Sequence, residues 1–311
     1  MLYGAIEGGG TKFVCAIGYS ATEVHESVVL PTSDPEATLG ACVDFFAAAE
    51  RKFGPIGAMG FGCFGPLDLR VESSTHGHML ATPKPAWSGV NLLAPLLSRF
   101  GVPIAIDTDV AAAALAEWRL GRGRGFGSVA YVTVGTGIGA DLAPRDMLPN
   151  RLMHPEMGHI GVRRDRRDTF AGMCPFHADC LEGLASGPAI YQRWGCELAT
   201  LPPQHEAWSI IGAYLGQLAA TMALVLSVEC IIFGGGVMAN GLILPHIRTA
   251  AAASLNGYLQ PLSHAGALDR YITGSQLGGR AGIVGAFLLA ESVSPNHRDH
   301  NNLRWPLPER P

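Results

Sequence analysis

Two segments share a pattern of strand, glycine turn and strand, and this repeat constrains the fold more than any other feature. The first, GAIEGGGTKFVCAIG, occupies residues 4–18, and the second, SVAYVTVGTGIGADL, occupies residues 128–142. Backbone without a Cβ can approach an anion closely, and neighbouring N–H groups can then cradle a phosphate. The repeat predicts an internal duplication in which each half begins with a phosphate-binding hairpin.

The hairpins match neither of two common nucleotide-binding signatures. No Walker A pattern, Gly-x-x-x-x-Gly-Lys-Ser/Thr, occurs in the chain. The first turn leads to a strand rather than a helix, which excludes the Rossmann fingerprint. A third glycine run, Gly234–Gly236, follows the apolar strand ECIIFG. It predicts a helix from about Met238, at whose start the backbone would lie against a nucleotide.

His159, Cys174, His177 and Cys180 form a second pattern. Fourteen residues separate the first two, and two separate each later pair. Thiolate and imidazole are ligands that Zn²⁺ prefers, and four of them fill a tetrahedron without leaving a place for water. The spacing predicts a structural zinc site. The alternatives are a disulfide between Cys174 and Cys180, or two unrelated buried thiols.

Glutamates are interleaved with these cysteines and histidines. Glu156 precedes His159 by three residues, so the two would share one side of a helical turn. Glu182 follows Cys180 by two residues. Carboxylates accept hydrogen bonds only, and they suit a ligand with several hydroxyl donors, such as a sugar. The alternative is that both glutamates are solvated surface charges.

Residues 102–121 predict a short strand followed by an alanine-rich helix. The strand would end at Asp107 and the helix would begin at about Thr108. We expect Asp107, rather than Thr108, to be the N-cap and Asp109 to be a functional base in the first turn. Such a position at the carboxyl end of a strand points into the ligand crevice of an α/β sheet. The alternative is that both aspartates serve helix capping alone.

The remaining apolar patterns predict ordinary elements and one long loop. Helices are expected at residues 35–53, 207–228 and 277–291, and a buried strand at residues 56–63. Residues 65–91 are rich in loop-forming residues. Two interpretations stay open for this loop: it is a proline-stiffened connection, or its side chains Thr82, Lys84 and Trp87 line a cleft.

Composition limits the class of protein. The 311 residues suit one large domain or two medium ones, and 48% hydrophobic content with 40 glycines fits a turn-rich enzyme. A net charge of −4 gives no reason to expect a nucleic-acid surface, and the arginine run at residues 163–167 is interpreted as a solvated loop.

The apolar segments give no reason to expect a membrane protein. The apolar run 209–233 is interrupted by polar residues and glycines, so it predicts a buried helix and strand. We expect no signal peptide, because Met1 leads directly into an apolar strand without a basic start. Four cysteines in apolar segments, Cys15, Cys42, Cys63 and Cys230, predict buried thiols of a cytoplasmic protein.

Seven segments together resemble the ROK family of sugar kinases, in the actin/hexokinase-like superfamily. They are IEGGGTKF, DTDVAAAALAE, VTVGTGIG, HPEMGH, CPFHADCLEGLASG, IIFGGGVM and LGGRAGIVGA. IEGGGTKF, ATPKPAW and HPEMGHI are most similar to the bacterial fructokinase branch. The resemblance implies an α/β, two-lobed, ribonuclease H-like fold with mixed sheets and an inserted zinc loop. It implies a small lobe of residues 1–115 and 284–296, a large lobe of residues 116–283, and a tail of residues 297–311.

The resemblance also implies roles for individual residues. Asp109 is the general base for the sugar hydroxyl, and Glu7 helps to organise Mg²⁺. The residues implied to hold the sugar are Glu156, His159, Glu182 and, from the long loop, Thr82. Those implied to border ATP are Gly9, Gly10, Thr11, Lys12, Gly135, Thr136, Gly137, Gly234, Gly235 and Gly236. The implied ligands of structural Zn²⁺ are His159, Cys174, His177 and Cys180.

The implied activity is ATP-dependent phosphorylation of a hexose at its 6-hydroxyl, with D-fructose preferred. Glucose, mannose or an N-acetylhexosamine is the alternative substrate, and a non-catalytic protein is a further alternative. Regulators of the family have an N-terminal helix-turn-helix, for which a first strand at Leu2 leaves no room. We expect a homodimer whose small-molecule partners are a hexose and ATP, with no nucleic acid and no membrane.

Two positions depart from the family pattern. Glu7 stands where much of the family has aspartate, although fructokinase-like members share the glutamate. Ala111 stands where asparagine is expected in many relatives, in a DTDVN segment. The extra methylene of Glu7 bears on the position of the implied Mg²⁺, and the amide missing at Ala111 bears on substrate choice and rate more than on the class of reaction.

Overall fold

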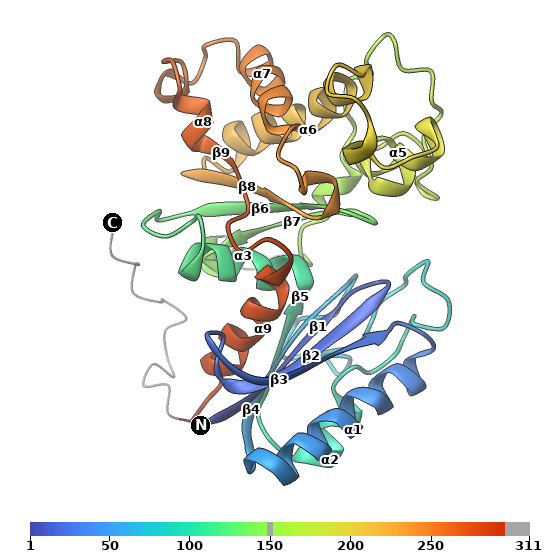
Figure 1. Ribbon diagram of the computed structural model, residues 1–311, viewed down its shortest axis with the longest axis vertical. Helices are drawn as coiled ribbons and strands as arrows, with labels where there is room; N and C mark the ends of the chain where they lie inside the picture. Colours follow the sequence, from blue (N-terminus) through green and yellow to red (C-terminus); the bar gives the residue numbers. More distant parts are fainter. Residues whose placement is uncertain (148–151, 296–311) are drawn as a thin grey trace. The chain divides into compact units, whose positions relative to one another are not determined.

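Both copies of the repeated hairpin are parts of mixed β-sheets in the computed structural model, which describes residues 1–147 and 152–295 (Figure 1). The described chain forms two units. Unit 1 contains residues 1–116, 152–154 and 280–295, and unit 2 contains residues 117–147 and 155–279. The predicted α/β fold with mixed sheets is confirmed. The expected tail, residues 297–311, lies outside the described residues.

Unit 1 is built on a five-stranded sheet in the order β3-β2-β1-β4-β5. The first three strands are antiparallel neighbours, and β4 and β5 run parallel to β1. The strands are β1 (Leu2–Gly8), β2 (Lys12–Ser20), β3 (Glu23–Pro31), β4 (Ile56–Cys63) and β5 (Ile104–Thr108). The parallel pairs therefore place the ends of β1, β4 and β5 at one edge of the sheet.

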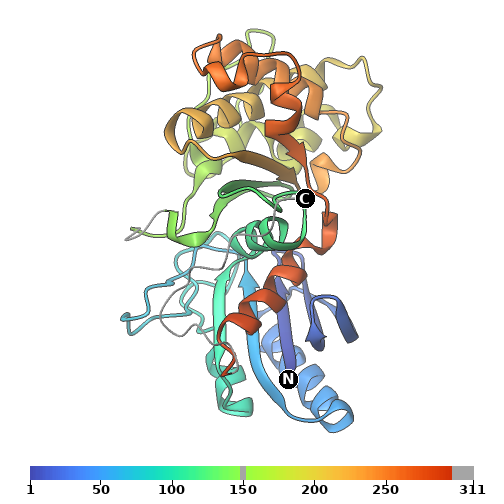
Figure 2. The same ribbon diagram turned by 90° about the vertical axis from the view of Figure 1, so that its left-hand side faces the viewer.

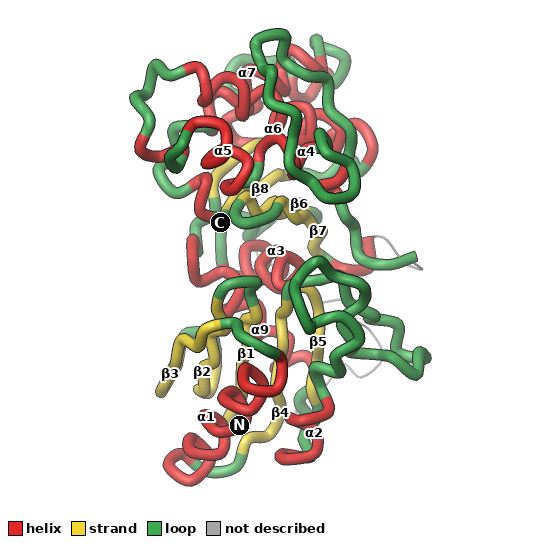
Figure 3. The backbone as a smooth tube through the Cα atoms, turned by 90° about the vertical axis from the view of Figure 1, so that its right-hand side faces the viewer, coloured by secondary structure: helices red, strands yellow, loops and turns green. Residues whose placement is uncertain are grey.

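Helices cover both faces of this sheet (Figures 1 and 3). They are α1 (Pro35–Phe53), α2 (Ala94–Phe100), the first part of α3 (Asp109–Leu120) and α9 (Ala281–Ser292). The period of two along β1 decides which side chain meets which helix. Ile6 packs in the cluster that includes Phe46 of α1, whereas Ala5 packs with Ala286 and Phe287 of α9.

Glycines let α9 lie directly against its neighbours (Figure 2). A Cβ on Gly60 of β4 would come within 1.9 Å of the Ala286 carbonyl oxygen. A Cβ on Gly285 would come within 1.9 Å of the Ala112 carbonyl oxygen in α3. Such approaches leave room only for glycine, because any side chain would force the backbones apart. The close packing fixes the start of α9 beside the end of β1.

Unit 2 is built on a four-stranded sheet in the order β7-β6-β8-β9. The strands are β6 (Val129–Val134), β7 (Ile138–Ala143), β8 (Cys230–Gly234) and β9 (Ile272–Gly274). β7 is antiparallel to β6, and β8 and β9 continue the sheet in parallel. Every residue of β8 is buried, as expected for a parallel strand covered on both faces.

The helices of unit 2 include one long apolar helix. They are α4 (Leu181–Ala185), α5 (Gly187–Trp194), α6 (Glu206–Val225), α7 (Leu244–Leu255) and α8 (Ala267–Tyr271). Among the described residues, α6 alone is long and apolar enough to cross a membrane, but 67% of its most apolar window is buried inside the protein. Gly212 and Gly216 of α6 allow α7 to pack closely against it. The predicted buried helix is confirmed.

Two helix starts were predicted too early. After the glycine run, residues Gly236–Met238 form only a 3₁₀ turn, and α7 begins at Leu244. Gly241 adopts a positive φ of 68°, which interrupts a helix, and Pro245 then favours a first helical turn. The closing helix begins at Ala281 after a 3₁₀ turn at Gly278–Arg280, rather than at residue 277.

Candidate functional site

The glycine turn between β1 and β2 has its carbonyl groups held by the rest of unit 1. The Gly9 amide donates to the Lys12 carbonyl at 2.9 Å and closes the turn. Thr32 holds two more carbonyls: its hydroxyl donates to Gly9 at 2.8 Å and its amide donates to Thr11 at 3.0 Å. Among the residues that the structure describes, none accepts a hydrogen bond from the amides of Gly10 or Thr11. These two N–H groups are therefore available to an anion.

Two carboxyl groups lie at the same edge of the unit 1 sheet. Glu7, near the end of β1, accepts a hydrogen bond from the Ile283 amide in the first turn of α9, and its carboxyl group packs against Gly282. Burial, and then the charge of Asp109, raise the pKa of Glu7 to about 7. Burial likewise raises the pKa of Asp109 to about 6. At neutral pH Asp109 is therefore mostly ionised and close to the pKa that suits a general base.

The start of α3 corrects the predicted cap. β5 extends to Thr108 and α3 begins at Asp109. The Thr108 hydroxyl accepts from the Ala111 amide at 3.1 Å, which is the bond of an N-cap. Asp107, expected as the cap, instead accepts from the Thr108 amide at 2.9 Å within the strand. The Asp109 carboxylate accepts from the amide of its neighbour Val110 at 2.8 Å, which is not the bond of an N-cap.

The glycine turn between β6 and β7 is fixed in a similar way in unit 2. The Gly135 amide donates to the Gly137 carbonyl at 2.9 Å, and the Gly187 amide at the start of α5 donates to the Gly135 carbonyl at 2.8 Å. The Glu182 carboxylate accepts from the Ile138 amide at 2.8 Å. A Cβ on Gly137 would come within 2.7 Å of that carboxylate, so a side chain here would displace Glu182. Glu182 and the second turn thus form one rigid group.

The four predicted metal ligands converge in unit 2. Their ligand atoms all lie within 4.8 Å of one another. The His159 Nδ1 atom lies 3.6 Å from both the Cys174 and Cys180 sulfurs, and His177 Nδ1 lies 3.7 Å from Cys174. A tetrahedral zinc with bonds of about 2.3 Å to sulfur and about 2.1 Å to nitrogen sets these atoms about 3.6 Å apart. Both cysteines are free, so the alternative disulfide is wrong.

His159 connects this metal cluster to the second turn. Its Nδ1 faces the sulfurs, and its Nε2 lies 3.9 Å from the Glu182 carboxylate. A carboxylate that accepts a hydrogen bond from the far nitrogen orients a metal-binding histidine, and the Glu182 carboxylate lies just beyond hydrogen-bond distance for this role. His159 lies at the end of a 3₁₀ turn, Met157–His159, and Glu156 precedes this turn with its side chain exposed. The structure brings His159 and Glu182 together.

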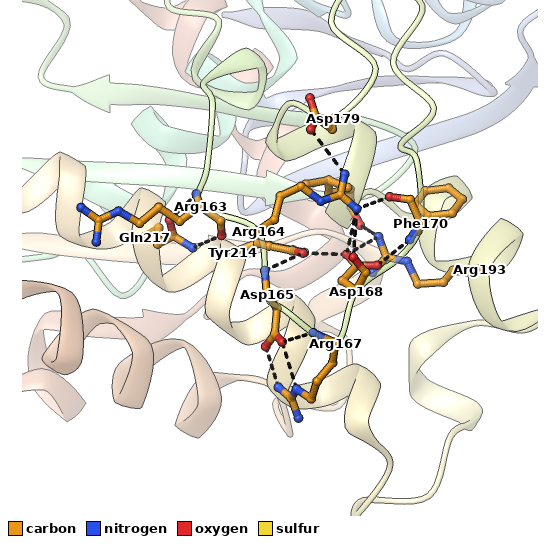
Figure 4. A network of polar contacts seen from close by, with 11 residues as sticks. Arg163, Arg164, Asp165, Arg167, Asp168, Phe170, Asp179, Arg193, Tyr214 and Gln217 are labelled. Carbon is orange, nitrogen blue, oxygen red and sulfur yellow. Dashed lines mark hydrogen bonds and ion pairs between the residues drawn. The ribbon is translucent and has the colours of Figure 1, made fainter.

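The arginine run after His159 is largely exposed, as the interpretation of a solvated loop expects, but Arg164 is partly buried in a polar network around Asp168 (Figure 4). Asp168, whose side chain is 1% exposed, accepts from the Tyr214 hydroxyl at 2.6 Å and pairs with Arg193 at 3.2 Å. Arg164 donates to the carbonyls of Asp168 and Phe170. Arg193 in turn donates to Leu184 of α4 at 2.9 Å. This group, which we term the Asp168 clasp, fastens the long loop before α4 to α5 and α6 (Figure 3).

The remaining predicted residues occupy varied surroundings. Trp87 is fully buried in the unit 1 core and donates to the Ser33 carbonyl at 3.0 Å, so it lines no cleft. Thr82 stays partly exposed. Gly234 ends β8, where a Cβ would collide with the Tyr131 hydroxyl at 2.0 Å, and Gly235 has a positive φ of 91°.

Sequence reasoning missed two residues of these sites. Thr32 orients the first turn, and nothing in its sequence context signals this because it comes from the far end of β3. Glu117 in α3 is fully buried, and it accepts from the Arg122 amide at 2.7 Å, the Ser275 hydroxyl at 2.5 Å and the Leu277 amide at 2.8 Å. For Glu117, the available signal was a single glutamate inside an alanine-rich helix.

In the described chain, two α/β units each present a glycine hairpin. The ROK family profile matches residues 3–293, so the chain belongs to the ROK family. The chain is 39% identical over 292 residues to a putative fructokinase of Bacillus subtilis (strain 168), with 94% of this chain and 96% of the relative covered. It is 38% identical to a fructokinase of Pediococcus pentosaceus, covering 95% and 100% of the two chains.

A solved structure agrees with this assignment. A ROK family glucokinase from Streptomyces griseus, in complex with glucose and AMPPNP, superposes with a TM-score of 0.71 at 25% identity. The match covers 94% of this chain and 100% of that chain. The relatives thus define a sugar kinase.

Proposed function

We propose that this sugar kinase transfers the γ-phosphoryl group of ATP to the 6-hydroxyl of D-fructose. The observation that supports fructose is the identity of 38–39% to full-length relatives named fructokinase, against 25% to the glucokinase structure. The AMPPNP of that structure supports ATP as the donor. Ala111 departs from the expected DTDVN segment, and the proposal includes that this alanine is compatible with fructose as the substrate.

Asp109 is the proposed general base. Its carboxylate takes the proton of the sugar hydroxyl as that oxygen attacks the γ-phosphorus, while the bond from the γ-phosphorus to the bridging oxygen breaks and ADP leaves. Its pKa of about 6 leaves the base ionised at neutral pH. Burial also leaves it less solvated than a surface carboxylate, which strengthens its interaction with a hydroxyl donor.

The two glycine turns are the proposed phosphate ligands, through Gly9–Lys12 in unit 1 and Gly135–Gly137 in unit 2. Gly234–Gly236 is proposed to border the adenosine. Phosphoryl transfer depends on positioning and charge neutralisation, which backbone amides supply without reorganising. Bound Mg²⁺ would neutralise phosphate charge, and Glu7 is the residue proposed to orient it.

Glu156, His159, Glu182 and Thr82 are the proposed sugar ligands. The bond from Ile138 to Glu182 supports this role for Glu182, because it fixes one carboxylate oxygen and leaves acceptor capacity on the other. His159, Cys174, His177 and Cys180 are proposed to hold structural Zn²⁺. A homodimer and a cytoplasmic location stay predictions.

The experiment is coupled ADP release from MgATP with fructose, glucose, mannose and N-acetylmannosamine in parallel. We expect the highest kcat/KM with fructose. Preference for another hexose would keep the kinase chemistry and replace the substrate. Absence of ADP release with all four sugars would contradict the proposed activity.

A further inference from the structure

We propose that Lys84 is a positioning residue for the phosphoryl donor: its ammonium group fixes the Gly10–Thr11 peptide of the first glycine turn and adds a positive charge beside it. Lys84 lies in the ATPKPAW segment, far from the turn in sequence. Its Nζ atom donates to the Gly10 carbonyl oxygen at 2.5 Å. This inference rests on the proposed kinase function and adds a residue to it.

The first step of the argument is the geometry of a peptide unit. In a trans peptide the C=O and the following N–H point in opposite directions. Thr32 holds the Gly9 carbonyl, so it fixes the direction of the Gly10 N–H. Lys84 holds the Gly10 carbonyl, so it fixes the direction of the Thr11 N–H. Within the first glycine turn, the Gly10 and Thr11 amides are the ones for which no described residue is an acceptor.

The second step is electrostatic. A carbonyl oxygen turned toward a polyphosphate would repel it, whereas an amide N–H would attract it. The Lys84 ammonium occupies the Gly10 carbonyl and adds a full positive charge at the turn. Charge-assisted hydrogen bonds are about twice as strong as neutral ones. A neutral donor at the same place would orient the peptide but would not attract phosphate.

The third step is the rigidity of the segment that holds Lys84. Pro83 and Pro85 flank it and restrict its backbone. Trp87, fully buried, anchors the end of the segment through its bond to the Ser33 carbonyl. The Thr82 amide donates to the Ser88 hydroxyl at 3.0 Å and closes the loop. The lysine stem therefore starts from a fixed point, which lowers the entropy lost when its ammonium group binds.

The opposing interpretation is that Lys84 only fastens one loop to another. Lys84→Met removes the donor and the charge and keeps the stem, whereas Lys84→Arg keeps the charge. We expect Lys84→Met to lower kcat/KM for MgATP by about 10- to 100-fold. The KM for the hexose should change less than about twofold, since a residue at the phosphate turn acts mainly on the donor. Lys84→Arg should restore part of the loss.

The matched control is Lys52→Met. Lys52 forms an exposed ion pair with Glu26 in the same unit, at 2.8 Å. Lys52→Met should leave kcat/KM for MgATP and the KM for the hexose unchanged, because exposed ion pairs contribute little to stability. Unchanged kcat/KM for MgATP in Lys84→Met would overturn the proposal. So would equal losses for ATP and hexose together with a lower Tm, which is the signature of a fastening role alone.

Calorimetric titration with MgAMPPNP separates this inference from the proposed activity. If the wild-type protein phosphorylates none of the four sugars, the proposed activity fails, but the nucleotide affinities of wild type and Lys84→Met can still be compared. Weaker binding by Lys84→Met then supports the role of Lys84. Equal affinities, or no nucleotide binding by the wild type, overturn it.

Discussion

At the scale of single residues, the unit 1 site depends on two carboxyl groups whose pKa values are raised. Burial is the larger cause of the raised pKa of both Glu7 and Asp109, and the charge of Asp109 adds to the shift of Glu7. A buried carboxylate is costly unless a ligand or cation compensates it. The raised pKa of Asp109 therefore suits proton acceptance, at a cost in stability.

The pH dependence of the reaction follows from Asp109. A base must be deprotonated to act, and the pKa of Asp109 is about 6. We expect kcat/KM for the hexose, measured at saturating MgATP, to fall about tenfold per pH unit below this pKa. A rate that stays constant from about pH 5 to 8 would exclude Asp109 as the base.

Replacing Asp109 should separate activity from stability. Asp109→Asn should lower kcat by at least about 10²-fold, in the range of general base catalysis. Its pKa is raised by folding, so the folded state binds the proton more tightly, and ionisation as pH rises costs stability. At pH 7.5 the uncharged asparagine should therefore leave Tm unchanged or higher.

The control for this variant is Asp44→Asn, on the exposed side of α1. It should change neither kcat nor Tm, because the carboxyl group stays in water. A lower Tm in Asp109→Asn would show that the residue supports the fold. In that case its loss of activity would say nothing about proton transfer.

At the scale of elements, the loop from His159 to Cys180 is fastened twice. The four-residue metal cluster gathers its ends, and the Asp168 clasp holds its middle against α5 and α6 (Figure 4). Burial and the hydrogen bond to Asp168 raise the pKa of Tyr214 to about 12, so it remains a donor at all ordinary pH values. Because Glu182 follows this loop directly, both fastenings bear on the second glycine turn.

Removal of the metal should affect stability and activity together. We expect Cys174→Ser, or a strong chelator, to lower Tm and to raise the KM for the hexose, since His159 and Glu182 lose their fixed positions. The check is metal content by elemental analysis beside a thermal scan. Protein purified without chelator and found free of zinc would rule out the proposed metal.

The clasp should stabilise the loop independently. Tyr214→Phe removes one donor to the buried Asp168 carboxylate, at an expected cost of about 1–3 kcal/mol in the free energy of unfolding. It should also speed zinc loss to a chelator, because the loop opens more readily. Urea unfolding and the rate of chelator-induced metal release measure the two effects.

The comparison variant for the clasp is Arg167→Gln. Arg167 pairs with Asp165 at 2.6 Å on the protein surface, so its loss should cost less than about 1 kcal/mol. Equal losses of unfolding free energy in Tyr214→Phe and Arg167→Gln would show that the buried hydrogen bond to Asp168 stabilises the loop no more than a surface ion pair does.

At the scale of the whole molecule, the chain enters and leaves unit 2 more than once. The first segment of unit 1 ends at Ala116 within α3; residues 152–154 belong to unit 1 again, and its last segment begins at Arg280 before α9. Glu117, the first residue of unit 2, accepts hydrogen bonds from Ser275 and Leu277 near the end of that unit. This buried carboxylate thus ties together the two ends of the segment that forms unit 2.

Glu117→Gln tests that tie. The glutamine side chain would place its NH₂ group opposite a group that now donates a hydrogen bond to the carboxylate. We therefore expect a loss of about 2–3 kcal/mol in the free energy of unfolding. Because the protein has two units, unfolding should be followed by two probes and analysed for an intermediate. An unfolding curve identical to that of wild type would show that Glu117 has no such role.

Local patterns in the sequence account for much of the fold. Apolar segments on both sides of a glycine turn predicted both hairpins, and helical spacing predicted α1 at residues 35–53, whose bounds agree with the structure. Ligand chemistry and spacing predicted the cluster of His159, Cys174, His177 and Cys180, which the structure gathers. The errors concern local choices between neighbouring residues. Thr108 rather than Asp107 is the N-cap of α3, and α7 begins at Leu244 rather than at about Met238.

The sequence by itself determined the hairpins, the metal cluster and the family, because these depend on neighbours in the chain and on residue types with few alternative uses. Only the tertiary structure decided that Lys84 meets Gly10, that Asp168 is buried beside Tyr214, and that Glu117 joins the ends of unit 2. The physical reason is distance along the chain. A hydrogen bond between residues tens of positions apart exists only after the packing of other elements has brought its donor and acceptor together.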